Sequence, residues 1–420
     1  MSQGDTPPRE NGPGRSVKRI LDYLGLERNI LVMTCSSSAA GLGTWLWTGY
    51  LGKVLKAQGA SGTMIGAFGT FNRIAGIAFS FLGGSLSDRL GRGRALIAAT
   101  LFSLLGYVIY MFAPVWWVFL PGSLLITAGA QSAFMGSLAM LGETVDRRRR
   151  AVSLASQRII AYFPAIVSPP LGGLLMSRLG VVPGFRTALG VTVALTLVSV
   201  YLQKRLYRLP PPATQRLSLS ILASWRAMST NLKRLLVANS LAFFGSGMTH
   251  LFRVLYVMDV MGVSALRYGF LQALETISMA ILIVPIGKLA DRMGSVGRKR
   301  ITALDFFANG LFSLLIPLVP SVGWLYLVFA LPGVRESLEP ARKALLVELA
   351  GRREHGRTIG FYYFLLGVAN FPASFLAGLL WEWNPVAPFL VGGSITMAGF
   401  LIMLFFGPKV EDSCRSSLIT

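Results

Sequence analysis

The sequence predicts an all-α integral membrane protein in which twelve transmembrane helices form two related bundles of six. Composition is the first reason: of 420 residues, 53% are hydrophobic and only 14% are charged, and the mean hydropathy is +0.59. A soluble chain of this length is less apolar. The second reason is a series of apolar stretches, each long enough to cross roughly 30 Å of hydrocarbon as a helix. The third is internal repetition, since a charged motif at residues 84–94 recurs in altered form at 287–300.

Twelve apolar segments follow one another from residue 29. Each is bounded by polar or charged residues, which sets its approximate ends. The expected spans are 29–50, 61–86, 95–113, 117–142, 156–177, 184–206, 235–258, 266–290, 301–319, 324–348, 358–381 and 386–406.

Polar segments divide the chain into two halves. Residues 1–28 lack the apolar core of a signal peptide, so a cytoplasmic tail is expected there. Residues 208–234 contain a run of three prolines at 210–212 and are expected to be a cytoplasmic linker. The linker separates a first bundle at 29–207 from a second at 235–407, and residues 408–420 form a second cytoplasmic tail.

The basic residues alternate between the two sides of the predicted membrane. One side holds nearly all of them, and the other has only Lys53, Lys56, Arg178, Arg186 and Arg267. Short basic loops stay in the cytoplasm, so a multi-pass protein of the plasma (inner) membrane with both termini inside is expected.

The net charge of +22 is better explained by basic loops facing anionic lipid than by nucleic acid binding. Cys35 lies in an apolar run and Cys414 in the polar tail, where they are poorly placed to pair. No disulfide, metal site or cofactor is expected.

Short matches between the halves occur in the same order. Leu-Pro-Gly stands at 120–122 and again at 331–333, and Phe-Pro-Ala at 163–165 and again at 371–373. Together with the charged motif, these landmarks indicate two related units, as in transporters that rock one bundle against the other.

Ionisable side chains inside the predicted spans are the candidate functional residues, because such groups are costly in a membrane unless they face a cavity or a partner. The tenth span carries Arg335, Glu336 and Glu339 between Pro332 and Pro340. Arg335 and Glu339 are one turn apart and spaced to pair. Glu336 has no obvious local partner and is the candidate for proton coupling. The alternative is a buried salt bridge that only fixes helix packing.

Other spans carry further candidates. These are Arg73 in the second, His250 and Arg253 in the seventh, and Glu275 in the eighth. A buried His is often a packing residue, and Arg73 has an equally plausible structural role. Trp45, near the end of the first span, suits either substrate contact or an aromatic belt at the interface.

The repeated motif combines an acid, an arginine and glycines that allow a tight bend. The first copy contains Gly84, Asp88, Arg89, Gly91 and Arg92. The second contains an insertion at 295–297 and the residues Gly287, Asp291, Arg292 and Gly294. The spacing resembles the loop signature of the major facilitator superfamily of secondary transporters, between its second and third helices, with a weaker copy between the eighth and ninth. Gly93 stands where a second basic residue is usual.

Two further comparisons with this family bear on coupling. Ser-Pro-Pro-Leu-Gly-Gly at 168–173 resembles part of the antiporter motif, although the upstream glycines are missing. The fourth helix reads Thr-Ala-Gly-Ala-Gln-Ser at 127–132 and lacks the arginine of many proton-coupled members, which excludes coupling through that residue. Proton sites are therefore expected in the second half, at Glu275, Glu336 and Glu339.

The resemblance implies a fold in which the first, fourth, seventh and tenth helices surround a central cavity, with the two motifs acting as cytoplasmic latches. The loop acid would interact with the positive end of a helix in the other half. The expected function is proton-coupled efflux of a small organic compound by a monomer.

Uptake by symport, or transport of an organic anion attracted by Arg73, Arg253 and Arg335, is the nearest alternative. A receptor or scaffold that moves nothing is the alternative of another class. An enzyme is not expected, because no His, Cys or carboxylate cluster has ligand or nucleophile spacing.

Overall fold

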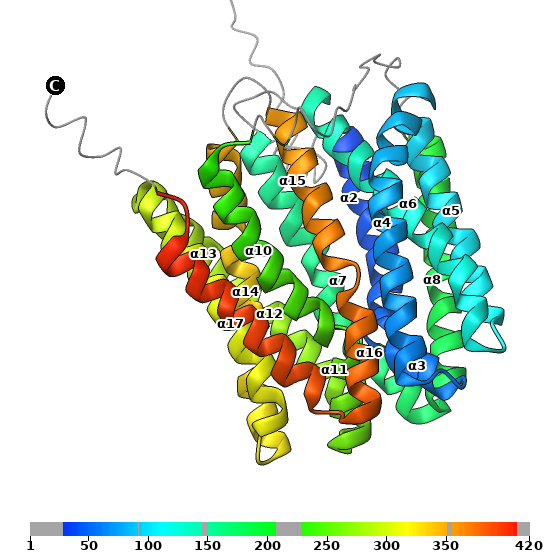
Figure 1. Ribbon diagram of the computed structural model, residues 1–420. Coiled ribbons are helices and arrows are strands. Elements are labelled where there is room, and N and C mark those ends of the chain that lie inside the picture. The colour runs from blue at the N-terminus through cyan, green and yellow to red at the C-terminus, as the bar shows by residue number, and fades with distance from the viewer. Residues whose placement is uncertain are drawn as a thin grey trace, which may run out of the picture.

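The computed structural model describes residues 28–90, 92–144, 150–206, 225, 228–350 and 355–409. Within these ranges the chain is a bundle of long helices joined by short turns (Figure 1). Six described helices are long and apolar enough to cross a membrane by length and composition, and a seventh is obtained if one bent pair is counted as a single span. Each of the other expected segments also overlaps a helix that runs alongside these.

The first six helical segments pack against one another. They are α2 (Arg28–Trp47), which continues through η1 (Thr48–Tyr50) into α3 (Leu51–Ala57), then α4 (Gly62–Leu90), α5 (Arg92–Phe112), α6 (Phe119–Thr144) after η2 (Trp116–Val118), α7 (Arg150–Leu179) and α8 (Val181–Leu206). Contacts between α5 and α6, α2 and α8, and α4 and α6 hold this first group together.

The second six segments form another group. They are α10 (Thr230–Thr249), followed by α11 (Phe252–Leu255) and η3 (Tyr256–Val260), then α12 (Ala265–Arg292), α13 (Gly294–Leu315) with η4 (Ile316–Leu318), α14 (Val322–Leu349), α15 (His355–Asn370) with α16 (Ala373–Trp383), and α17 (Ala387–Phe406). Contacts of α10 with α17, α12 with α14 and α13 with α14 dominate inside this second group. The predicted fold class, an all-α membrane protein of two six-helix bundles, is confirmed.

Two spans are interrupted in the second group. The span of α10 and α11 bends by 40° at residues 250–251. The span of α15 and α16 breaks at Phe371 and Pro372, where the proline lacks the backbone N–H that a continuous helix would use. Most of the predicted linker, residues 208–224, lies outside the described residues, so the exact division of the chain stays a prediction.

The repeated motifs are more helical than expected. Residues 84–90 continue α4, α5 begins at Arg92, and only Gly91 between them lies outside the described residues. In the second copy, α12 runs to Arg292 and α13 begins at Gly294, which has φ +61°. The helices therefore extend further into both motifs than the expected spans, which ended at residues 86 and 290 and resumed at 95 and 301. The bend at the second copy occurs at Met293 and a single left-handed glycine, and the insertion forms the first turn of α13.

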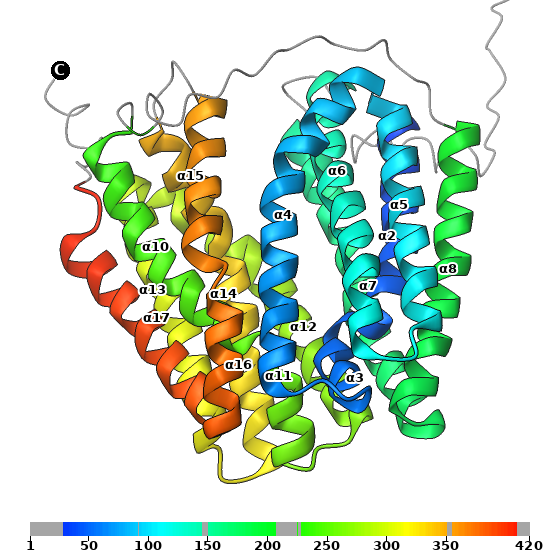
Figure 2. The same ribbon diagram turned by 45° about the vertical axis from the view of Figure 1, so that its right-hand side comes forward.

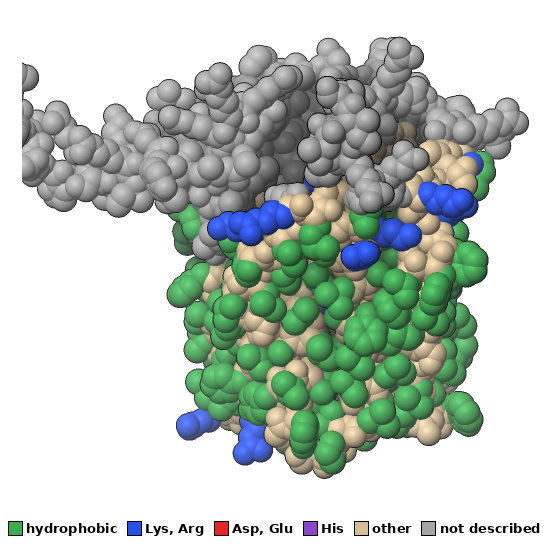
Figure 3. All heavy atoms as spheres, turned by 90° about the vertical axis from the view of Figure 1, so that its left-hand side faces the viewer, with side chains coloured by type: hydrophobic (Ala, Val, Ile, Leu, Met, Phe, Trp, Pro, Cys, Tyr) green, Lys and Arg blue, Asp and Glu red, His purple; other side chains and the backbone are tan. Residues whose placement is uncertain are grey.

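The molecule has two distinct ends. The end at which α4 and α12 finish and α5 and α13 begin is called the basic end here, because the Arg-rich motifs lie there. The other end, with α3, η3 and η4, is called the opposite end (Figure 2). On the face seen in Figure 3, hydrophobic side chains cover the middle, and lysines and arginines lie toward the two ends. This distribution fits a protein embedded in a bilayer.

One hydrophobic core crosses both groups near the opposite end. It joins Phe68 of α4 and Val54 of α3 with Phe252, Tyr268 and Trp381 of the second group. Trp47 also belongs to this core, is 3% exposed, and meets the rings of three neighbours edge to face, Tyr107, Tyr110 and Phe185. Packing, rather than an interfacial belt, therefore accounts for Trp47.

Candidate functional site

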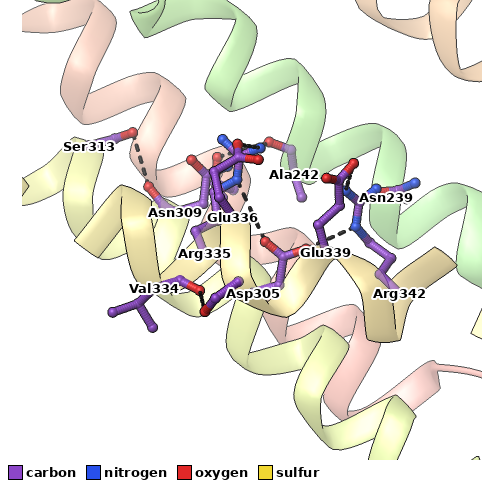
Figure 4. A network of polar contacts seen from close by, with 12 residues as sticks. Asn239, Ala242, Asp305, Asn309, Ser313, Val334, Arg335, Glu336, Glu339 and Arg342 are labelled. Carbon is purple, nitrogen blue, oxygen red and sulfur yellow. Dashed lines mark hydrogen bonds and ion pairs between the residues drawn. The ribbon is translucent and has the colours of Figure 1, made fainter. Parts of the chain in front are cut away.

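The charged face of α14 holds a compact ionic network (Figure 4). Arg335 Nη2 lies 2.7 Å from Glu336 Oε1, and Arg335 Nε lies 3.7 Å from Asp305 Oδ1 of α13. The side chains of Arg335 and Glu336 are 23% and 33% exposed. The expectation that Glu336 lacks a local partner is wrong, because Arg335 next to it in the sequence turns toward it.

Asp305 is the buried centre of this network. Its Oδ2 accepts a hydrogen bond of 2.9 Å from Arg342 Nε, and both side chains are about 5% exposed or less. Arg342 also donates to Asn239 Oδ1, whose amide in turn donates to Tyr362 at 2.7 Å. Neither Asp305 nor Arg342 was a candidate from the sequence. An acid near the start of the ninth apolar segment was the signal that would have identified Asp305.

Glu339 forms its ion pairs with Lys343 at 3.0 Å and with Arg342 at 3.7 Å. The expected pair between Glu339 and Arg335 is therefore wrong. The reason lies in the packing of two helices. Asp305 of α13 lies between Arg335 and Arg342, so Arg335 pairs with Asp305 and Glu336 instead.

Arg253 and Glu275 come together as a second ionic pair. Arg253 is on α11, and its Nη1 lies 2.9 Å from Glu275 Oε2 on α12. The guanidinium also lies over the rings of Phe312 and Phe329, at 5.7 and 5.4 Å from their centroids. A cation held between a carboxylate and two aromatic faces is strongly localised.

His250 and Arg73 bring the first group into the same region. His250, at the break between α10 and α11, is exposed and lies within electrostatic reach of Arg73, Arg253 and Arg335. Arg73 of α4 points across the interface, with Nη2 3.0 Å from the position that a Cβ on Gly247 of α10 would occupy. The structure thus brings Arg73, His250, Arg253 and Arg335 into one region, beside the point where α4 contacts α10.

Two predicted sets of residues lie apart from this region. Trp45 is 43% exposed, and among the described contacts it takes part in no ring stacking. Gly91 lies outside the residues that the structure describes. The surroundings of five other motif residues are not described either: Gly84, Asp88, Arg89, Arg92 and Asp291. The latch roles therefore stay predictions. At the same end, Arg298 Nη1 of α13 pairs with Glu348 Oε2 of α14 at 3.0 Å.

Polar contacts join the two groups at the opposite end. Asp259 of η3 forms ion pairs with both Lys53 and Lys56 of α3, the latter at 2.8 Å. Glu382, at the end of α16, accepts a hydrogen bond of 3.2 Å from the backbone N–H of Thr63 in the first turn of α4. A carboxylate at a helix N-terminus is favoured by the exposed N–H groups there. We call this set of contacts, together with the glycines described next, the seam.

Glycines bring the backbones of the two groups into close contact along the seam. A Cβ on Gly269 of α12 would lie 2.7 Å from the hydroxyl of Tyr50, which itself donates to the carbonyl oxygens of Pro169 and Ala265 at 2.8 and 3.1 Å. A Cβ on Gly69 of α4 would lie 2.8 Å from Ser374 Cβ of α16. Small residues at helix crossings allow this approach in membranes, and any larger side chain would force the helices apart.

Comparison with known proteins agrees with this architecture. The family model described as "Major Facilitator Superfamily" matches residues 31–334 and 235–417. The uncharacterized MFS-type transporter MJ1317 of Methanocaldococcus jannaschii is 26% identical over 217 residues, covering 50% of this chain and 52% of that protein. Multidrug resistance protein MdtL of Salmonella typhimurium (strain LT2) is 28% identical over 219 residues, covering 50% and 53%. This chain spans about half the length of the curated relatives it matches.

Solved structures share the fold at low identity. A peptide transporter POT in complex with sulfate has a TM-score of 0.71 at 14% identity, covering 90% of this chain and 94% of that chain. The human organic anion transporter MFSD10 (TETRAN) has a TM-score of 0.62 at 17% identity, covering 90% and 99%. At these identities the likeness concerns the fold alone. The family model covers nearly all of the helical part of the chain, and the chain therefore belongs to the Major Facilitator Superfamily.

Proposed function

We propose that this protein is a monomeric secondary transporter that works by alternating access and exports a small organic compound in exchange for protons. The observation that carries the proposal is the contrast between the opposite end, where the two groups are in close contact, and the middle of the molecule. At the opposite end they are joined by the seam, while nearer the middle Arg335 and Glu336 keep 23% and 33% of their side-chain surface accessible. Charged groups at this depth are tolerated where they face water or a ligand.

The proposed orientation places the basic end and both termini in the cytoplasm, with the chain in the plasma (inner) membrane. It rests on the distribution of Lys and Arg, which favours the cytoplasmic side. In that orientation the seam closes the outer side of the described conformation. Asp88 and Arg89, with Asp291 and Arg292, are proposed to latch the inner side in the other conformation.

Glu336 is the proposed proton-coupling residue. Among the carboxylates of the charged region, Asp305 is held by Arg342 and Arg335, Glu339 by Lys343 and Arg342, and Glu275 by Arg253 and its aromatic neighbours. Glu336 pairs with Arg335 alone and is the most exposed of the four. A carboxylate with one partner and access to solvent loses least when it binds a proton.

Export is favoured by the resemblance to MdtL, which is named a multidrug resistance protein. Proton-coupled uptake is the second candidate, since the polar region serves either direction. A receptor or scaffold that moves nothing is the third. It has less support, because a static protein needs neither glycine contacts along a separable seam nor accessible charges beside it.

Transport by reconstituted protein in opposite pH gradients tests the proposal. The tracer is the compound that most stabilises the purified protein in a thermal-shift screen. Accumulation into vesicles with an acidic lumen indicates exchange for protons, whereas accumulation from an acidic exterior indicates symport. A tracer that binds but accumulates under neither gradient would favour the receptor.

The same assay isolates the role of Glu336. We expect Glu336→Gln to abolish accumulation against a gradient and to retain tracer exchange down its gradient, because glutamine keeps a hydrogen-bonding group but does not titrate. Glu411→Gln in the predicted C-terminal tail is the matched control and should transport normally. Gradient-driven accumulation by Glu336→Gln at the normal rate would exclude this residue from coupling.

A further inference from the structure

The charged side chains near the interface do not balance. Within the part of the chain that the structure describes, the region has five cations and four carboxylates: Arg73, Arg253, Arg335, Arg342 and Lys343 against Glu275, Asp305, Glu336 and Glu339. Every carboxylate is paired with at least one of the cations of the second group. The remaining positive charge is that of Arg73, the one member of the set on the first group, which has no ion pair among the described residues.

Arg73 is too deep to reach the lipid headgroups. It stands eleven residues after the start of α4 at Gly62, which corresponds to about 16 Å along the helix, roughly half of the hydrocarbon thickness. Its guanidinium does not extend along the membrane normal to an interface but crosses to Gly247 on α10. An arginine at this depth without an acid costs several kcal/mol unless water solvates it or a ligand supplies the counter-charge.

Both interrupted spans meet Arg73. One turn before it, Thr70 donates to the carbonyl oxygen of Phe371 at 2.8 Å and accepts from the N–H of Phe375 at 3.1 Å, and so ties α4 to the break between α15 and α16. His250 marks the break between α10 and α11. Interrupted helices at mid-membrane expose backbone and side-chain polar groups, and in transporters they are where substrates bind.

Asn370, the last residue of α15, supplies an independent observation. Its side chain is 2% exposed, yet Oδ1 has no hydrogen-bond partner. This atom lies 3.3 Å from the position of a Cβ on Gly247, the same position that Arg73 Nη2 approaches at 3.0 Å. A donor and an unpaired acceptor therefore lie beside the same glycine. A Cβ on Gly247 would also lie 3.1 Å from Ala373 Cβ, so only a residue without a side chain allows these atoms to come so close. A buried polar atom without a partner is costly and indicates a missing partner.

We propose that Arg73, His250 and Asn370 form an anion-binding subsite, and that the transported compound is an organic anion with a single negative charge, such as a carboxylate or sulfonate on an apolar body. This inference rests on the proposed transport function and names its substrate class. Arg73 binds the anionic group with paired N–H donors, His250 contacts it from the second group, and Asn370 Oδ1 accepts from an N–H or O–H of the compound. One negative charge is favoured because one positive charge is in excess.

A subsite built from both groups also links binding to conformation. Arg73 belongs to α4, whereas His250 and Asn370 belong to α10 and α15. A ligand that bridges them stabilises the arrangement in which these helices are close. It therefore has different affinity for the two states of the transporter, which alternating access requires.

The test uses three skeletons, each in an anionic, a neutral and a cationic form. The acids are 4-hydroxybenzoate, 6-hydroxy-2-naphthoate and 10-hydroxydecanoate, whose hydroxyl groups supply the donor that Asn370 Oδ1 needs. They are compared with the primary amides and the amines of the same hydroxylated skeletons, by thermal shift and equilibrium binding to the purified full-length protein. We expect the acids to bind best to the wild-type protein. Their affinity should fall at least tenfold in Arg73→Gln and recover in part in Arg73→Lys. Arg267→Gln, an exposed arginine at the start of α12, is the matched control and should bind as the wild type does.

The outcomes separate this inference from the proposed function. Amides or amines that bind as well as the acids, or acids that bind Arg73→Gln unchanged, would overturn the anion subsite while leaving a transporter of neutral or cationic compounds. Binding of no compound of any charge, together with no accumulation of the screened tracer in either pH gradient, would overturn both. If Asn370→Ala loses acid binding while its melting temperature is unchanged, Asn370 also belongs to the subsite.

Discussion

Replacing Gly66 by alanine tests directly whether the seam controls the conformation. Gly66 lies on α4, one turn from Gly62 and one turn from Gly69, and faces α16. A Cβ there would lie 3.0 Å from Cα and 3.1 Å from N of Gly378, and closer still to the carbonyl oxygen of Ser374. All three atoms are backbone atoms of α16, so no side-chain rotation relieves the contact.

The magnitude follows from this geometry. Carbon atoms pack at about 3.5 to 4.0 Å, so α4 and α16 must separate by roughly half an ångström or more at this crossing. Overpacking of this kind costs about 1–3 kcal/mol. The cost falls only on the state in which the opposite end is closed, so the equilibrium between the two states should shift by about 5- to 150-fold toward an open opposite end.

Distances between spin labels measure the shift. Cysteines are introduced at Ala57 of α3 and Val260 of η3, which are exposed at the opposite end on different groups, after Cys35 and Cys414 are replaced by serine. We expect a longer distance to become the main population in Gly66→Ala. Gly360→Ala on α15 is the control, because a Cβ there meets nothing within 4 Å. An unchanged distance distribution in Gly66→Ala, with the protein still folded, would refute the argument that backbone contact holds this end closed.

Three other substitutions probe separate parts of the structure. Asp259→Asn removes both ion pairs to α3, each worth up to about 1 kcal/mol. The open population at the opposite end, measured with the same spin labels, should therefore rise about tenfold. If high salt leaves the distance distribution of the wild-type protein unchanged, the ion pairs do not contribute. Asp305→Asn leaves Arg342 buried without a full counter-charge and should lower the free energy of unfolding by about 3–5 kcal/mol. The expected result is a lower melting temperature and a poor yield. A normal melting temperature would mean that water reaches the pair. Asp88→Asn should slow tracer turnover with little loss of folded protein, and unchanged transport would count against the inner latch.

The helices and their order were predictable because the signals are local. Each apolar run is set by composition over some twenty residues, and lipid forces such a run into a helix that satisfies its own backbone. The breaks were less predictable. Pro372 marks one of them, yet α14 continues through Pro332 and Pro340 without interruption. A proline leaves open whether the helix bends or stops, and the neighbouring helices decide.

The sequence predicted which residues belong to the candidate site better than it predicted which of them pair. Depth in a span identified Arg73, Arg253, Glu275, Arg335 and Glu336 as unusual. Their partners come from other helices: Arg253 pairs with Glu275 across two helices, and Asp305 approaches α14 from α13. The spacing rule that joined Arg335 to Glu339 treats one helix in isolation. Besides Glu336, Arg335 pairs with Asp305 of α13, and no pattern within α14 predicts that pair.

By itself, the sequence determined that this chain lies in a membrane, spans it twelve times in two related halves and belongs to a transporter family. Hydrophobicity, segment length and repeated motifs are local features of the sequence, so they need no tertiary structure to be recognised. The tertiary structure decided which charges are paired, which one is left over and where the two halves touch. These depend on how far one helix lies from another. Contacts between residues more than 170 positions apart, such as Lys53 with Asp259 or Arg73 with Gly247, leave no periodicity in the sequence from which they could be predicted.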